Sequence, residues 1–178
     1  YVACCDKEVK QLLENKNIKY ILTKKNLKSG TDRVYDAFIK IKNFQKYKLI
    51  INLQGDLPYF NHKYLKKLQQ LASIKKFQMA TLACPILSKK KILDKNIVKL
   101  VLSNYRANVS RAIYFSRLPV PFGTKKYYEH IGVYAYTAKT LENFINCKQS
   151  NLEKLEKLEQ LRALENEVNI LVGLVDKA

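Results

Sequence analysis

Short apolar runs alternate with longer amphipathic stretches along most of the chain. Runs of strand length predict β-strands at residues 1–4, 19–22, 49–53, 79–83, 98–102 and 168–175. Between several of them, apolar residues recur at helical spacing and predict helices over residues 6–15, 29–44 and 61–73. Strands and helices that alternate in this way indicate an α/β fold with a mostly parallel sheet.

A proline-rich segment interrupts this alternation. Pro119, Pro121 and Gly123 separate two further strand-like runs at 112–115 and 131–134. Two strands joined by such an excursion can pair with a partner chain or cap an active site. A helix is then predicted over residues 151–166, where leucine recurs at every third position. A coiled coil needs a mean repeat of 3.5, so this helix is expected to pack into the domain instead.

Length and composition fit one globular domain over residues 1–178, with 47% hydrophobic residues. No apolar run approaches the ~18 residues of a membrane span. The four cysteines have no CxxC spacing, so we expect a reduced, cytoplasmic protein without a zinc site. The chain begins and ends in strand-like runs, and the sequence therefore predicts a domain truncated at both ends.

The formal charge of +18 raises the alternative of a nucleic-acid-binding module. Lysines outnumber arginines 28 to 5 and are spread over nearly all predicted surfaces. Recognition of phosphates and bases relies heavily on the planar guanidinium of arginine. We therefore expect no nucleic-acid partner, although the charge favours small anionic ligands.

The run INLQGDLP at 51–58 carries the first candidate chemistry. The buried strand ends at Gln54-Gly55-Asp56, and ligands of α/β sheets bind at the carboxyl ends of strands. A carboxylate there can hold Mg²⁺, which takes oxygen ligands. The alternative is an ordinary turn, because glycine and aspartate are common turn residues.

Three other polar groups have both a structural and a functional interpretation. Ser29-Gly30-Thr31-Asp32-Arg33 begins a helix, so Ser29 can cap it with Asp32 as its partner, or the segment can bind an anion. Arg117 follows a strand and needs an anionic partner if it is buried. His130 begins a strand, where histidine is more often structural than catalytic.

Seven runs, taken in order, resemble the CMP-Kdo synthetases, which are 3-deoxy-manno-octulosonate (Kdo) cytidylyltransferases. They are SGTDR (29–33), NLQGD-P (52–58), MATLACPI (79–86), N-VK-V (96–101), YFSR--VP (114–121), HIGVYAY (130–136) and LEKLEKLEQLR (152–162). The resemblance covers nearly the whole chain. It implies a Rossmann-like nucleotide-diphospho-sugar transferase fold and an enzyme that forms CMP-Kdo and pyrophosphate from CTP and Kdo for lipopolysaccharide biosynthesis.

The same resemblance assigns roles to individual residues. Asp56 would be the Mg²⁺ ligand and a catalytic residue together with Arg117, whose guanidinium suits the carboxylate of Kdo. The nucleotide and sugar crevice would be lined by Ser29, Gly30, Thr31, Arg33 and Gln54. The sugar would be held by Gln54, Arg117, His130, Tyr134, Glu159 and Gln160. The excursion at 112–136 would contribute to a homodimer, and no membrane partner is implied.

Three departures from the family pattern bear on activity. The arginine-, serine- and lysine-bearing phosphate loop and the GVDTPEDL-like run with the second metal carboxylate have no counterpart here, and Leu57 replaces the usual glutamate. Both segments supply charge to the transition state, so we expect these residues alone to be nearly inactive. The alternatives are a non-enzymatic truncated remnant and a cytidylyltransferase for a sialic acid-like sugar.

Overall fold

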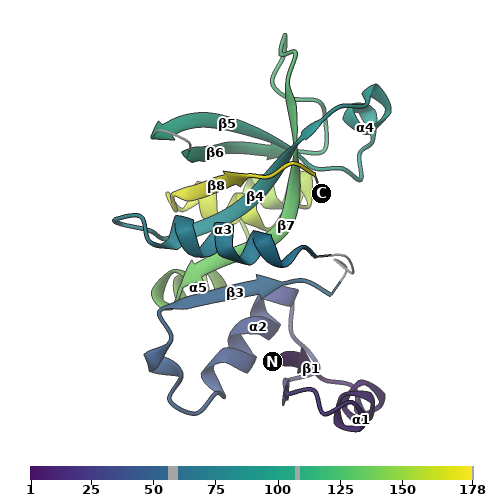
Figure 1. Ribbon diagram of the computed structural model, residues 1–178, viewed down its shortest axis with the longest axis vertical. Helices are drawn as coiled ribbons and strands as arrows, with labels where there is room; N and C mark the ends of the chain where they lie inside the picture. Colours follow the sequence, from purple (N-terminus) through teal and green to yellow (C-terminus); the bar gives the residue numbers. More distant parts are fainter. Residues whose placement is uncertain (56–59, 107–108, 178) are drawn as a thin grey trace. The chain divides into compact units, whose positions relative to one another are not determined.

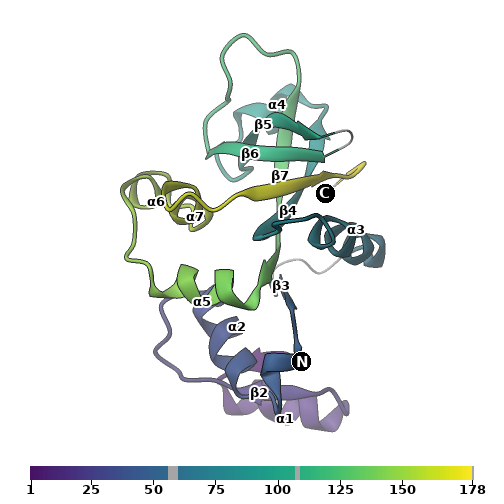
Figure 2. The same cartoon turned by 90° about the vertical axis from the view of Figure 1, so that its left-hand side faces the viewer.

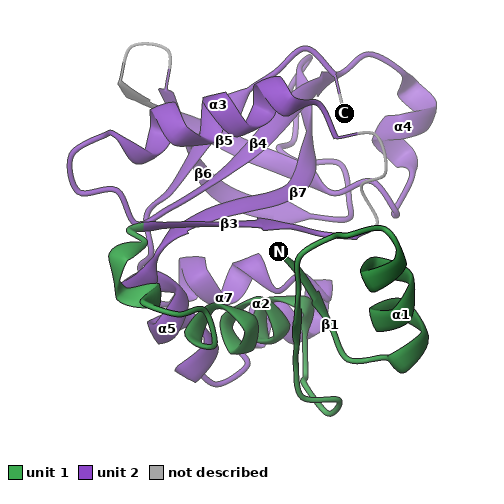
Figure 3. Cartoon of the chain, turned by 60° about the horizontal axis from the view of Figure 1, so that its bottom comes forward, with its two compact units in different colours: residues 1–48 green, residues 49–178 purple. Residues whose placement is uncertain are grey.

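A computed structural model of the chain describes residues 1–55, 60–106 and 109–177. The chain divides into two compact units, Tyr1–Lys48 and Leu49–Ala178, which are coloured separately in Figure 3. Asp56 and Leu57 lie outside the described residues.

The first unit contains a small parallel sheet and two helices. Its elements are β1 (Val2–Cys4), α1 (Lys7–Asn15), β2 (Tyr20–Leu22), α2 (Gly30–Ile39) and the 3₁₀ turn η1 (Phe44–Lys46). Strands β1 and β2 pair in parallel, and α1 connects them. The predicted strands and the first helix of this unit are confirmed, and α2 ends earlier than its apolar stripe indicated.

The second unit is built on a six-stranded sheet (Figure 1). Its strands follow the order β3-β7-β4-β8-β6-β5, and β5 also pairs with β7. The elements are β3 (Leu49–Leu53), α3 (His62–Ala72), β4 (Met79–Ile86), α4 (Lys89–Leu93), β5 (Lys99–Arg106), β6 (Val109–Ser116), β7 (Tyr127–Thr137), α5 (Ala138–Asn146), α6 (Asn151–Glu156), α7 (Gln160–Glu165) and β8 (Ile170–Leu174).

The large sheet is mixed, so the prediction of a mostly parallel sheet is wrong. Among the described residues of this sheet, only β4 and β8 pair in parallel, and the remaining pairings are antiparallel. Parallel neighbours need a long crossover, usually a helix. No helix separates β5, β6 and β7 in the described chain. The two strands of the 112–136 segment are thus members of the chain's own sheet.

Helices cover both faces of the large sheet (Figure 2). Helix α3 packs on one face, where Leu68 and Leu71 join a buried cluster with Leu82 and Leu171. Helices α6 and α7 lie on the opposite face. Gly173 permits the close approach of α3, because a Cβ there would lie 2.9 Å from the side chains of Leu82 and Lys67.

The helix predicted over residues 151–166 is two helices, α6 and α7. Lys157 separates them with a left-handed backbone conformation, φ 55°. A leucine at every third position drifts around a continuous helix, so one helix cannot bury them all. The break leaves Leu155 exposed on α6 while Leu158 and Leu161 are buried.

A buried ion pair between Arg162 of α7 and Glu153 of α6 connects the two helices. Arg162 donates from Nε to Glu153 Oε2 at 2.8 Å and from its NH2 group to Glu153 Oε1 at 2.6 Å. Its guanidinium also lies 4.7 Å from the ring centroid of Phe144 on α5. Burial raises the pKa of Glu153, but the bonds from Arg162 and the Ser150 N–H outweigh it and leave that pKa below its ordinary value.

Arg162→Met is expected to destabilise the second unit by about 3 kcal/mol, because Glu153 is left buried without its cation. Urea unfolding measures the loss. The control is Lys91→Met, which removes the more exposed pair with Glu129 and is expected to cost less than about 1 kcal/mol. Equal losses in the two variants would contradict this account of the α6–α7 junction.

Candidate functional site

Polar and aromatic side chains gather on the face of the large sheet that carries α5 to α7. Strand β7 places Tyr134 opposite Asn52 of β3 on one side and opposite Thr81 of β4 on the other. Directly opposed residues in an antiparallel pair share a face of the sheet. Asn52, Tyr134 and Thr81 are all buried. They therefore form a buried polar row across three strands, which we call the β3–β7–β4 row.

His130 lies beside this row. Its Nε2 is 2.9 Å from Thr81 Oγ1, and its ring contacts Phe115 and Tyr134 at centroid distances of 5.0 and 5.4 Å. Burial among these groups lowers the pKa of His130 to about 3. The imidazole is therefore neutral at physiological pH, which suits it to hydrogen bonding and excludes a fixed positive charge.

Tyr134 connects His130 to the α6–α7 segment. Burial raises the pKa of the Tyr134 phenol, and the nearby Tyr136 and the Glu159 carboxylate raise it further. Glu159 Oε1 lies 3.5 Å from the Arg162 guanidinium, and Gln160 is buried at the start of α7. The structure thus brings the predicted residues His130, Tyr134 and Glu159 together, with Gln160 next to Glu159 in the chain.

Arg117 is held by main-chain carbonyls. Its Nε donates to Glu156 O and its NH1 group to Lys95 O, each at 3.0 Å. The Glu156 carboxylate accepts from the Arg117 N–H at 3.0 Å and from Ser116 Oγ at 2.8 Å. These contacts tie the end of β6 to the end of α6. Binding of a substrate carboxylate by Arg117 stays a prediction.

Sequence reasoning missed two buried polar residues near these groups. Lys99 is fully buried, and its ammonium donates to the carbonyls of Asp94, Ile97 and Arg117 at 2.7 Å each. Burial lowers the pKa of Lys99. Thr81 is the other. Each is a single polar residue inside an apolar strand run, which is a sequence signal for a buried polar role.

In the first unit, Ser29 is the N-cap of α2, as one of the two interpretations predicted. Its Oγ accepts from the Asp32 N–H at 3.1 Å and donates to the Asp32 carboxylate at 2.8 Å. Arg33 donates to Thr23 Oγ1 at 2.6 Å and to Lys24 O at 3.2 Å. Thr31 is buried, and no atom lies within 4 Å of a Cβ built on Gly30. Nucleotide binding by this segment stays a prediction.

The predicted magnesium ligand cannot be placed in this site. Gln54 is half-buried just after β3, but Asp56 lies outside the described residues. The described ranges contain no group of three or more His, Cys, Asp or Glu residues that could hold a metal ion.

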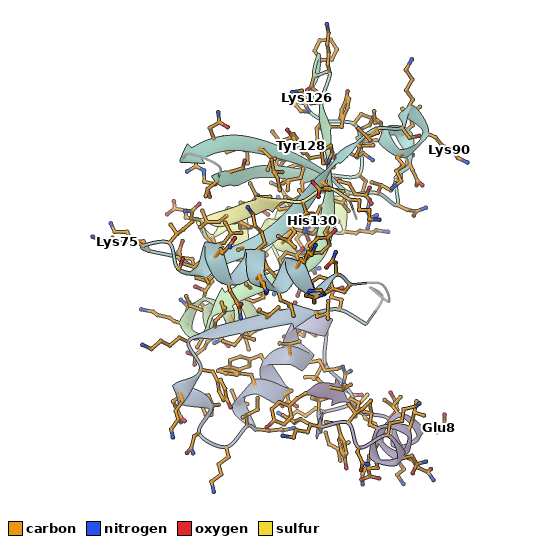
Figure 4. The ribbon with its side chains drawn as sticks, in the orientation of Figure 1. Glu8, Lys75, Lys90, Lys126, Tyr128 and His130 are labelled. Atoms are coloured by element: carbon orange, nitrogen blue, oxygen red, sulfur yellow. The ribbon has the colours of Figure 1, made fainter. Side chains whose placement is uncertain are left out.

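The described ranges also contain no helix long and apolar enough to cross a membrane. The lysines labelled in Figure 4 project from different sides of the second unit.

Comparison with solved structures defines the class of protein. The fold resembles apo UDP-glucose pyrophosphorylase (TM-score 0.58, 13% identity, 97% of this chain and 61% of that chain). It matches far better a CMP:2-keto-3-deoxy-manno-octonic acid synthetase complexed with CTP (TM-score 0.86, 30% identity, 97% of this chain and 70% of that chain). The chain has the α/β fold of the nucleotide-diphospho-sugar transferases.

Sequence comparison gives the family. The cytidylyltransferase family profile matches residues 1–170. A 3-deoxy-manno-octulosonate cytidylyltransferase from Bartonella bacilliformis is 42% identical over 160 residues, 90% of this chain and 66% of the relative. The same-named protein of Rickettsia prowazekii is 35% identical over 99% of this chain and 70% of the relative. The chain belongs to the cytidylyltransferase family, and it spans about two thirds of the length of these relatives.

The ring signals of His130 are expected to stay constant between about pH 8 and about pH 5, because its pKa is about 3. NMR of the His62→Gln variant measures this directly, since that variant retains His130 as its single histidine. The unfolded chain protonates His130 near the ordinary value of 6.5. Because the folded chain keeps His130 neutral, the free energy of unfolding is expected to fall as the pH drops below about 6.5. A ring titration centred near the ordinary pKa would contradict this burial.

Proposed function

We propose that this chain serves a cytidylyltransferase that transfers the CMP group of CTP to Kdo. The observation that carries the proposal is the match to a CTP-complexed synthetase over 97% of this chain with a TM-score of 0.86. Relatives named for the Kdo reaction support the choice of sugar. Neither a remnant without activity nor a sialic acid-like acceptor has a specific observation in its favour.

The proposed reaction is a single displacement at phosphorus. The anomeric hydroxyl oxygen of Kdo bonds to the α-phosphorus of CTP. The bond from that phosphorus to the oxygen bridging to the β-phosphate breaks, so that pyrophosphate leaves, and the hydroxyl proton passes to water. Such transfers depend mainly on positioning and on neutralisation of charge. Mg²⁺ bound by Asp56 and a cytoplasmic location remain predictions for this protein.

The proposed sugar site consists of the groups beside the β3–β7–β4 row. The neutral His130 and the Tyr134 phenol offer hydrogen bonds that suit sugar hydroxyls, and Gln160 adds a buried amide. Gln54, at the end of β3, would complete the site. We assign the Kdo carboxylate to Arg117, whose guanidinium already lies among three carbonyls of the chain.

Tyr134→Phe is expected to weaken Kdo binding about tenfold, the effect of losing one hydrogen bond of ordinary strength. Isothermal titration of the protein with Kdo measures the change. Tyr128→Phe is the matched control, because it removes a phenol hydroxyl from the same strand and is expected to leave binding unaltered. Absence of Kdo binding in the unaltered protein, or equal effects of both variants, would contradict the sugar site.

Pyrophosphate release tests the transfer itself. Any release from CTP is expected to require both Kdo and Mg²⁺, and chelation of the metal is expected to abolish it. Release that proceeds equally without Kdo would contradict the proposed acceptor. The same assay gives the rate of pyrophosphate release per protein molecule. This rate tests the expectation from the sequence that these residues alone are nearly inactive.

We also propose that a second copy of the chain binds the 117–126 loop. Phe122 is fully exposed and Leu118 is 57% exposed in this loop, and large apolar side chains left exposed are candidates for burial against a partner. Phe122→Ser is expected to shift a dimer to monomer in analytical ultracentrifugation. Leu155→Ser is the control, because Leu155 is exposed on α6. A monomer in the unaltered protein would contradict the proposal.

A further inference from the structure

Three polar atoms lie within hydrogen-bond distance of the Thr81 hydroxyl, which has a single proton to donate. Its Oγ1 lies 2.8 Å from Val133 O, 3.2 Å from Ile131 O and 2.9 Å from His130 Nε2. The register of β4 against β7 shifts between Thr81 and Leu82, which brings the two carbonyls to the same hydroxyl. Thr81 itself is fully buried, so water cannot substitute for these partners.

The two carbonyls determine the direction of the bond to His130. A carbonyl oxygen can only accept, so the hydroxyl proton must point to Val133 O or Ile131 O. With its proton directed to a carbonyl, the Thr81 hydroxyl can only accept a hydrogen bond from His130. His130 Nε2 must therefore carry a proton and donate it. Because the ring is neutral, its other nitrogen, Nδ1, carries a lone pair. The contact with Thr81 uses Nε2, and the Nδ1 lone pair can accept a hydrogen bond.

We propose that Thr81 is a positioning residue that holds His130 in its Nε2–H form, so that Nδ1 accepts a hydrogen bond from a sugar hydroxyl. A carboxylate has no proton to donate at neutral pH and is disfavoured at this nitrogen. His130 therefore selects the hydroxyl-bearing side of an acidic sugar, and the carboxylate binds elsewhere. This inference deepens the proposed function and rests on it for the identity of the ligand.

The tautomer is measured without any substrate. Nitrogen NMR of labelled imidazole distinguishes a protonated nitrogen from a bare one, and the His62→Gln variant makes the assignment unambiguous. The unaltered site is expected to show a protonated Nε2 and a bare Nδ1. A protonated Nδ1 in this spectrum overturns the proposal, whatever the protein does with Kdo.

Substitutions at Thr81 test its positioning role. Thr81→Val removes the hydroxyl with little change of shape, and it is expected to populate the Nδ1–H form and to weaken Kdo binding about tenfold. Thr81→Ser retains the hydroxyl and is expected to restore both readouts. Thr140→Val is the control for loss of a buried hydroxyl elsewhere in the second unit, and it is expected to leave the His130 spectrum unchanged.

The outcomes separate this proposal from the proposed function. An unchanged tautomer in Thr81→Val overturns the role of Thr81. The expected tautomers with no Kdo binding support the role of Thr81 and overturn the proposed sugar site. If Thr81→Val does not fold, the spectra of the unaltered protein and of Thr81→Ser still decide the tautomer.

Discussion

The register of β7 is the constraint on which the site depends. This strand pairs with β3, β4 and β5, and its alternate residues face opposite layers of helices. Ile131, Val133 and Ala135 join the core against α3, while Tyr134 and Tyr136 form a chain of ring contacts toward Phe144 of α5. A slip of one residue would exchange these two sets. The same pairing that buries the core therefore also presents the polar groups.

The helical side of the site is fixed by two separate polar anchors. Arg162 joins α7 to Glu153 of α6 through a bidentate ion pair. Glu156 joins the end of α6 to Ser116 and Arg117 at the end of β6. The segment between these anchors carries Glu159 and Gln160. Its position is thus determined by the buried Glu153–Arg162 ion pair and by the hydrogen bonds of Glu156, in addition to the buried leucines Leu158 and Leu161.

The sequence predicted most of the elements, because helical and strand periodicities reflect local burial. It did not predict the mixed sheet, since pairing direction depends on which distant strands meet and not on the pattern within one strand. Lys157 breaks the 151–166 helix through a left-handed backbone conformation that its residue type does not signal. The resemblance predicted His130, Tyr134 and Glu159 as sugar-binding residues; the structure brings them together, and sugar binding by them stays a prediction. Thr81 and Lys99 were missed because their roles depend on carbonyls of other strands and loops.

The central proposal is that an acidic sugar binds beside the β3–β7–β4 row of the second unit. The most direct measurement is a crystal structure of the protein with Kdo. The account predicts a sugar hydroxyl within hydrogen-bond distance of His130 Nδ1 and a second polar contact to Tyr134. A sugar bound at another face, or one whose carboxylate meets His130, would contradict it.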